Sequence, residues 1–238
     1  MNIKAMQYGF KQRLNKIDSQ QYRNLQIPEI DVKLNEAIGI FIKMVAEPKF
    51  RTRLGFEKSQ RTIDDIRTLV VNGESCTITN NTDSYIVTLP NDYLYFIGAD
   101  KAVIKKGSCE KKASKINLVE HDDDFKSSFY DKPSFLWGEI SFRFFEDGLN
   151  VFTGDFNLEE FYMNYIKVHP FVHNAEDFRQ GSYVNFDGTN LTGTQDCILP
   201  EQTHSEIVDI AVAVTTGDLQ IPDYEIKRAK LNMNQLNQ

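Results

Sequence analysis

The chain has 238 residues, of which 41% are hydrophobic, and a formal net charge of −7. This length suits one large domain or two small ones, and the acidic balance argues against a protein that grips nucleic acid by neutralising many phosphates. The three cysteines are an odd number and form no CxxC pair, so no disulfide framework is expected.

Residues 1–73 are predicted to be helical, because apolar side chains recur three and four positions apart. The first series is Ile3, Met6, Phe10, Leu14 and Ile17. The second follows Pro28 and Glu29, which suit a helix start, and comprises Ile30, Leu34, Ala37, Ile38, Phe41, Ile42 and Val45. A third helix is expected within residues 57–70, ended by Asn72 and Gly73.

Residues 74–173 form a block with the composition of strands. Tyr, Phe, Ile and Val, which fit a pleated surface, are frequent in segments 85–106, 112–120, 137–154 and 158–169. Asp147 and Gly148 predict a type I′ hairpin turn within the third segment. A short helical turn is expected at residues 120–129, where charged residues gather.

The rest of the chain predicts an arm and then a return to helix. Residues 174–199 are polar and broken by glycines, which is typical of a long loop or arm. Residues 200–238 predict helices and a tail, and the narrow apolar stripe of the first helix is Ile207, Ile210, Ala211 and Val214. The fold class expected is α+β, in which N- and C-terminal helices form a bundle with an inserted antiparallel β barrel or sandwich.

The stretch "CILPEQTHSEIVDIAV" (197–212) gathers residue types that also occur in metal and catalytic sites. A zinc helix needs a second His four positions after the first, but Val208 stands four after His204. We therefore interpret the stretch as an amphipathic helix with His204 on its outer face. No nucleophile, phosphate-loop or dinucleotide motif occurs, so no catalytic, metal or cofactor-binding residue is expected, and no enzyme.

Two other functions stay open at this point. A hydrolase of nucleic acid or glycan could carry paired carboxylates on the β block, with Asp122, Asp124 and Glu146 as candidates. A monomeric accessory binding module is the other alternative. No apolar run reaches the roughly 20 residues of a membrane span, so no membrane partner is expected.

Several segments occur together in a familiar order: "IDSQQYRNLQIPEIDVKLNEAIGIFI", "RTIDDIRTLV", "VTLPNDYLYF", "FYDKPSF", "YIKVHP" and "CILPEQTHSEIVDIAV". In these segments the chain resembles the ring, or head–tail connector, proteins of crAss-like tailed bacteriophages. More distantly it is similar to the tail tubular protein A adaptors of short-tailed phages.

The resemblance implies a structural virion protein without catalytic residues. Its subunits would form a ring of about twelve copies below the portal, which joins the capsid vertex to the tail and surrounds the DNA channel. The implied partners are other copies, the portal protein and other tail or ring proteins, while DNA passes without specific binding. The implied location is the portal vertex and tail, after assembly in the host cytoplasm.

The C-terminal tail supplies the candidate contacts with other subunits or partners. It is polar, with few apolar side chains to fold by itself. Its expected contact residues are Tyr224, Ile226 and Leu231 as apolar anchors, and Lys227, Arg228 and Lys230 toward an acidic neighbour.

Overall fold

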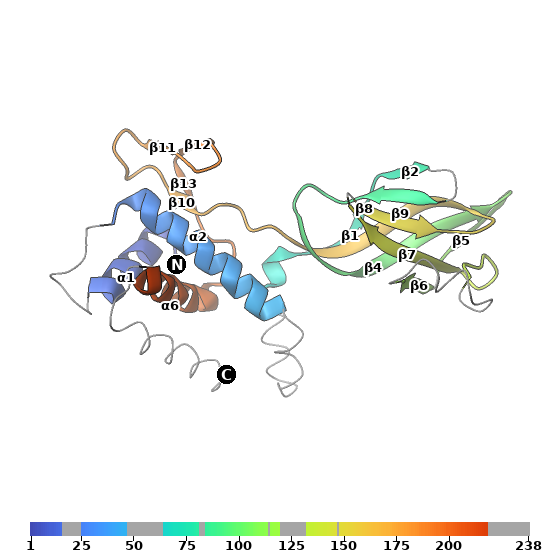
Figure 1. The fold of residues 1–238 in the computed structure, drawn as a ribbon, viewed down its shortest axis with the longest axis horizontal. Helices are drawn as coiled ribbons and strands as arrows, with labels where there is room; N and C mark the ends of the chain where they lie inside the picture. The colour runs from blue at the N-terminus through green and yellow to red at the C-terminus, as the bar shows by residue number, and fades with distance from the viewer. Residues whose placement is uncertain are drawn as a thin grey trace, which may run out of the picture. The chain divides into compact units, whose positions relative to one another are not determined.

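A computed structural model describes residues 1–15, 25–46, 64–80, 84–113, 115–119, 132–146 and 148–218 (Figure 1). The chain divides into two compact units. Met1–Leu69 and His169–Gln238 form the first, here termed the helical unit, and Val70–Val168 form the second, the β unit. The α+β class is therefore observed, and segments from the two ends of the sequence fold together.

In the described part of the helical unit, three α-helices pack together: α1 (Ile3–Asn15), α2 (Ile27–Ala46) and α6 (Glu201–Asp218). Helix α6 contacts both α1 and α2. The predicted apolar series of α1 and α2 form this core, and their buried members are Ile3, Met6, Phe10, Leu14, Ile30, Leu34, Ala37, Ile38, Phe41 and Ile42. Ile17 lies outside the described residues, as does the first half of the predicted third helix, residues 57–63.

Helix α6 is buried more widely than its sequence predicts. Besides Ile207, Ile210 and Ala211, its buried residues are Thr203, His204, Val208, Val212, Ala213, Thr215 and Thr216. The interpretation of a narrow stripe with His204 on the outer face is therefore wrong. The helix has neighbours on two sides, so polar residues must also enter the core. The Thr215 hydroxyl donates a hydrogen bond to the Ala211 carbonyl, and the Thr216 hydroxyl donates one to the Ala213 carbonyl, each at 2.8 Å.

The residues of the β unit that the structure describes form two sheets. One has the order β1 (Val70–Ser75), β9 (Asn157–Lys167), β4 (Tyr93–Lys106) and β5 (Cys109–Lys112). The other has the order β2 (Ile78–Asn80), β3 (Tyr85–Thr88), β8 (Gly148–Phe152), β7 (Glu139–Phe145) and β6 (Lys115–Leu118). Both sheets contribute to one core, whose fully buried members include Val87, Ile104, Ile140, Leu149 and Phe161.

The chain crosses between the sheets after β1. Cys76 donates its backbone N–H to Phe161 in the first sheet, and Thr77 accepts from Thr88 in the second. Such crossings at corners are typical of packed sheets. Within the described ranges, the ladders leave each sheet with two edge strands, so no closed barrel is seen. The pairing departs from the expected antiparallel pattern at β6 and β7, which run parallel.

Two expected turns are placed differently or in part. Asn72 and Gly73 do not end a helix: a short 3-10 helix, η1 (Arg67–Leu69), leads into β1, and both residues lie within that strand. Gly73 has φ 64° at a bulge and donates its N–H to the Asn164 side chain at 2.7 Å. The hairpin between β7 and β8 is confirmed, while its residue 147 lies outside the described ranges.

The segment that follows the β unit is an arm of two short hairpins, one inside the other in sequence. Strand β10 (His173–Asn174) pairs with β13 (Thr194–Gln195), and β11 (Ser182–Val184) pairs with β12 (Asn190–Thr192). The predicted loop at 174–199 therefore carries regular structure. No helix in the described part of the chain is long and apolar enough to cross a membrane.

Candidate assembly surfaces

A buried carboxylate fastens the arm to the helices. Asp31 of α2 is fully buried and accepts three hydrogen bonds. The donors are Gln7 Nε2 of α1 at 2.5 Å, the Asn174 backbone N–H at 3.0 Å and the Tyr183 hydroxyl at 2.8 Å. Burial raises the pKa of the Asp31 carboxyl, and these donors oppose part of the shift. The Asp31 carboxylate thus joins helices α1 and α2 to both hairpins of the arm.

Asn35, one turn after Asp31 on α2, extends this attachment. Its amide donates to the Val172 carbonyl at 2.7 Å and accepts the Val172 N–H at 2.8 Å. The same amide nitrogen also donates to the Asp31 carbonyl at 2.7 Å. The Asn35 side chain thus bonds both backbone groups of Val172, as a neighbouring strand would, and leaves neither without a partner. The base of the arm is therefore held in one position on α2.

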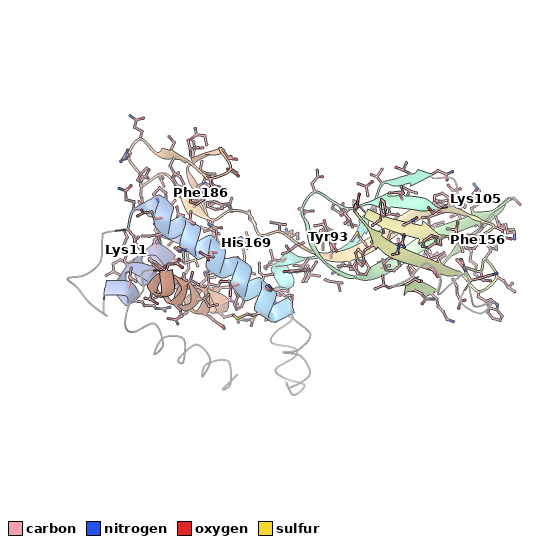
Figure 2. All side chains as sticks on the ribbon, viewed as in Figure 1. Lys11, Tyr93, Lys105, Phe156, His169 and Phe186 are labelled. Atoms are coloured by element: carbon pink, nitrogen blue, oxygen red, sulfur yellow. The ribbon has the colours of Figure 1, made fainter. Side chains whose placement is uncertain are left out.

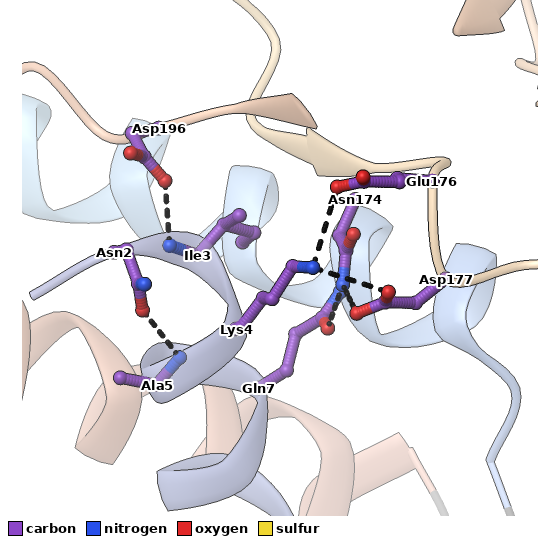
Figure 3. Close-up of polar contacts among 9 residues, drawn as sticks. All are labelled: Asn2, Ile3, Lys4, Ala5, Gln7, Asn174, Glu176, Asp177 and Asp196. Carbon is purple, nitrogen blue, oxygen red and sulfur yellow. Dashed lines mark hydrogen bonds and ion pairs between the residues drawn. The ribbon is translucent and has the colours of Figure 1, made fainter. Parts of the chain in front are cut away.

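The start of α1 is tied to the arm as well (Figure 3). Asp196 accepts the N–H of Ile3 at 2.7 Å, and Asn2 caps the same helix by accepting the N–H of Ala5 at 2.9 Å. Lys4 forms ion pairs with Glu176 at 3.3 Å and with Asp177 at 3.1 Å. These charged contacts are exposed, so they orient the arm more than they stabilise it.

Within the described ranges, His169 and Cys197 form a pair that resembles a nucleophile and its base. Cys197 Sγ lies 3.5 Å from His169 Nε2, but that nitrogen also accepts the Ile198 N–H at 3.1 Å. Burial raises the pKa of the Cys197 thiol to about 11, so the thiolate is scarce at neutral pH. The pair holds the chain that leads from the arm into α6, and its geometry favours a structural role.

The tip of the β11–β12 hairpin exposes apolar side chains on an ordered turn. Phe186 is 87% exposed and Val184 is 68% exposed; Figure 2 labels Phe186. The turn is closed by Asn185 N–H to Thr189 O at 2.9 Å, and the Asp187 carboxylate accepts the Thr189 N–H at 2.8 Å. Exposed aromatic groups on rigid turns are typical of contact surfaces rather than of folding.

The β unit has an apolar tip of its own. Ser134 and Glu139 bond each other's backbone in both directions at 2.9 Å, which closes a tight turn. At its apex Leu136 is 74% exposed and Trp137 is also exposed, and Lys111 Nζ donates to the Leu136 carbonyl at 2.6 Å. The two units therefore each expose large apolar side chains at the tip of a turn.

The structure does not place the contact residues expected from the sequence. Those residues are Tyr224, Ile226, Lys227, Arg228, Lys230 and Leu231, and they lie outside the described residues. Asp122 and Asp124 of the hydrolase alternative lie outside them too, while Glu146 is exposed. Among the residues the structure does describe, no group of three His, Cys, Asp or Glu could hold a metal ion.

Sequence reasoning missed the Asp31 network and the Phe186 tip. A signal for the first was present, because Asp31 precedes Leu34, Ile38 and Ile42 by three, seven and eleven residues and so shares their apolar face. An acid on that face predicts a buried partner. A signal for the second was an aromatic residue among the turn formers of "NFDG" (185–188).

Comparison with known proteins gives one match. A family model described as "Phage tail ring protein 3/4" matches residues 1–220, which include every described residue of both units. No curated protein shows a significant match to the chain. The match does not concern the tail tubular protein A adaptors, so that likeness stays an expectation. The chain belongs to the family of tail ring proteins 3/4 of crAss-like phages.

Proposed function

We propose that the chain is a subunit of a ring in the head–tail connector, below the portal, which joins the capsid vertex to the tail and surrounds the DNA channel. The observation that carries this proposal is the family match over residues 1–220. A ring protein of a phage tail is a structural component of the virion, and ring assembly needs contacts with other copies. The proposed copy number is about twelve, as the resemblance implies.

The architecture supports a structural role. The arm is anchored by buried polar groups at Asp31 and Asn35, yet it exposes Phe186 at its tip. A subunit that must meet its neighbours in one geometry benefits from such a rigid, anchored contact element, because less conformational entropy is lost on assembly. The same reasoning applies to the Leu136 tip of the β unit.

The charge of the chain suits a channel that lets DNA slide. A net charge of −7 disfavours tight phosphate binding, so DNA passes the ring without specific recognition. The proposed partners are therefore proteins: other copies, the portal protein and other ring or tail proteins. The proposed location is the portal vertex and tail of the virion, with assembly in the host cytoplasm.

The proposal is tested by the position and mass of the assembled protein. Electron cryomicroscopy of purified virions should show density for the chain in a ring on the head–tail axis, and native mass spectrometry of the isolated ring should give about twelve copies. A chain found only as a monomer, both alone and in virions, would contradict a ring subunit. A ring at another level of the tail would contradict the connector position alone.

The tail beyond residue 221 is proposed as an assembly element. Deletion of residues 222–238 should leave a folded subunit that enters particles poorly. Two matched triple variants separate the apolar contribution from the charged one. The first removes the apolar anchors by changing Tyr224, Ile226 and Leu231 to Ser. The second removes the positive charges by changing Lys227, Arg228 and Lys230 to Gln. Incorporation into particles at the wild-type level after the deletion would contradict this assignment.

A further inference from the structure

Two exposed patches in the helical unit have complementary chemistry. The first, here termed the tip patch, comprises Val184, Phe186 and Asp187 on the β11–β12 hairpin. The second, the α1 patch, comprises Tyr8 and Lys11 on the outer side of α1. Figure 2 labels Phe186 and Lys11 on separate parts of the helical unit.

The α1 patch is a helix surface with nothing packed on it in the described part of the chain. Tyr8 is 64% exposed, and its hydroxyl accepts a hydrogen bond from Gln12 Nε2 at 2.9 Å. Lys11 lies three positions after Tyr8, so both share one side of the helix. On that side Lys4 is engaged by Glu176 and Asp177, whereas Lys11 forms no ion pair with any described residue.

The tip patch offers the opposite charge. The Asp187 carboxylate accepts the Thr189 N–H, which lowers its pKa and keeps it ionised at neutral pH. Like Lys11, Asp187 forms no ion pair with any described residue. The tip patch thus carries an aromatic ring beside a carboxylate, and the α1 patch carries an aromatic ring beside an ammonium group.

We propose that the tip patch of one subunit docks on the α1 patch of a second copy of this chain, with Phe186 against Tyr8 and Asp187 beside Lys11. Both patches are exposed in a single chain, so the contact is made between copies. Because the two surfaces differ, the contact is head-to-tail and repeats around a closed ring. This inference rests on the proposed ring and names the surfaces that form it.

The charge pair of Asp187 and Lys11 and the aromatic contact of Phe186 and Tyr8 contribute to binding in different ways. Central aromatic groups carry most of the binding energy in protein interfaces, whereas rim charges mainly steer association and fix the register. Removal of either aromatic ring should therefore weaken the contact most. Removal of one charge should have a smaller effect, and that effect should diminish with added salt.

The test uses the full chain and measures oligomer mass by native mass spectrometry and sedimentation. Phe186→Ser and Tyr8→Ser should each weaken self-association by about thirtyfold or more. Ile97→Ser, which removes an exposed apolar side chain from strand β4 of the β unit, is the matched control for the loss of surface apolarity. It should leave the contact between the helical units unchanged.

Mixing the two variants gives the sharper result. A Phe186→Ser subunit keeps an intact α1 patch, and a Tyr8→Ser subunit keeps an intact tip patch. An equimolar mixture should therefore form heterodimers and stop there, because each pair has one intact contact. In the same way Asp187→Lys and Lys11→Glu should each weaken assembly, and the two changes in one chain should restore it.

Each outcome decides the matter. If Phe186→Ser forms rings as readily as the wild type, or if the mixture of variants forms no heterodimers, the docking inference is overturned and the ring proposal stands. A cross-linker at position 186 that captures another tail protein instead of a second copy would overturn it too. A wild-type chain that stays monomeric alone and in purified tails would overturn the ring itself.

Discussion

Replacement of Tyr183 by Phe should loosen the arm while leaving the helices folded. The substitution keeps the ring, which packs edge-to-face on Phe178 at a centroid distance of 5.9 Å, and removes only the hydroxyl that donates to Asp31 at 2.8 Å. A hydrogen bond to a charged group contributes about 1.5–3 kcal/mol. The backbone amides of the arm should therefore lose roughly ten- to hundredfold in protection against hydrogen exchange.

The effect should depend on pH in a defined direction. Burial raises the pKa of Asp31 in the folded protein above its ordinary value. Its contribution to stability is therefore full below the unfolded pKa of about 3.9 and is lost as pH rises through the folded value. Tyr183 opposes the raised pKa, because its hydroxyl stabilises the ionised carboxylate. Tyr183→Phe should thus cost more at neutral pH than in acid.

Hydrogen exchange followed by mass spectrometry, resolved to peptides within residues 172–195, measures the change. Tyr162→Phe is the matched control, since it removes a hydroxyl that donates to Glu160 at 3.0 Å on the surface. It should change local stability by less than about 0.5 kcal/mol. If Tyr183→Phe leaves protection of the arm equal to that of Tyr162→Phe, the Asp31 network does not hold the arm.

Three further predictions concern single residues. Gly148→Ala would place a Cβ 2.3 Å from a backbone oxygen of β3, so urea denaturation should show that the free energy of unfolding falls by about 1–3 kcal/mol. Gly98 has open space around it, so Gly98→Ala should leave that free energy unchanged. Burial lowers the pKa of His204, so its contribution to stability is lost as pH falls below about 6.5; thermal melting between pH 7 and 5 should be less pH-dependent in His204→Gln, and an unchanged slope would contradict this. At pH 8 iodoacetamide should alkylate exposed Cys109 well before Cys197, whose pKa is raised to about 11; equal rates by mass spectrometry would refute the assignment.

The sequence predicts the elements whose evidence is local. Helices α1 and α2 each bury one face, so their apolar residues recur with helical period and the series is readable. Helix α6 contacts two helices, and its buried residues spread around the axis, which weakens the periodic signal. The sequence pattern also does not show that β6 pairs parallel with β7, since strand pairing depends on contacts between residues distant in sequence.

The Asp31 network shows the same limit. Its partners Asn174 and Tyr183 stand 143 and 152 residues away, so no local spacing can connect them. What the sequence does show is the anomaly, an acid on an apolar helix face, because burial of a carboxylate is costly without donors. Local rules thus identify where a long-range partner is needed, and only the fold identifies the partner.

Phe186 is an anomaly of a second kind, and it bears on function. Asn185, Asp187 and Gly188 each have a reason to stand in the turn, since their side chains or backbone freedom close it. Phe186 takes no part in these bonds and is 87% exposed, so the fold of this chain does not require its ring. A large apolar side chain exposed next to Val184 on an ordered turn is available for contact with a surface outside the chain. In the ring proposed above, the surface that lies beside every subunit at fixed geometry is the next copy, and on this ground we assign the tip patch to a contact with the α1 patch of that copy.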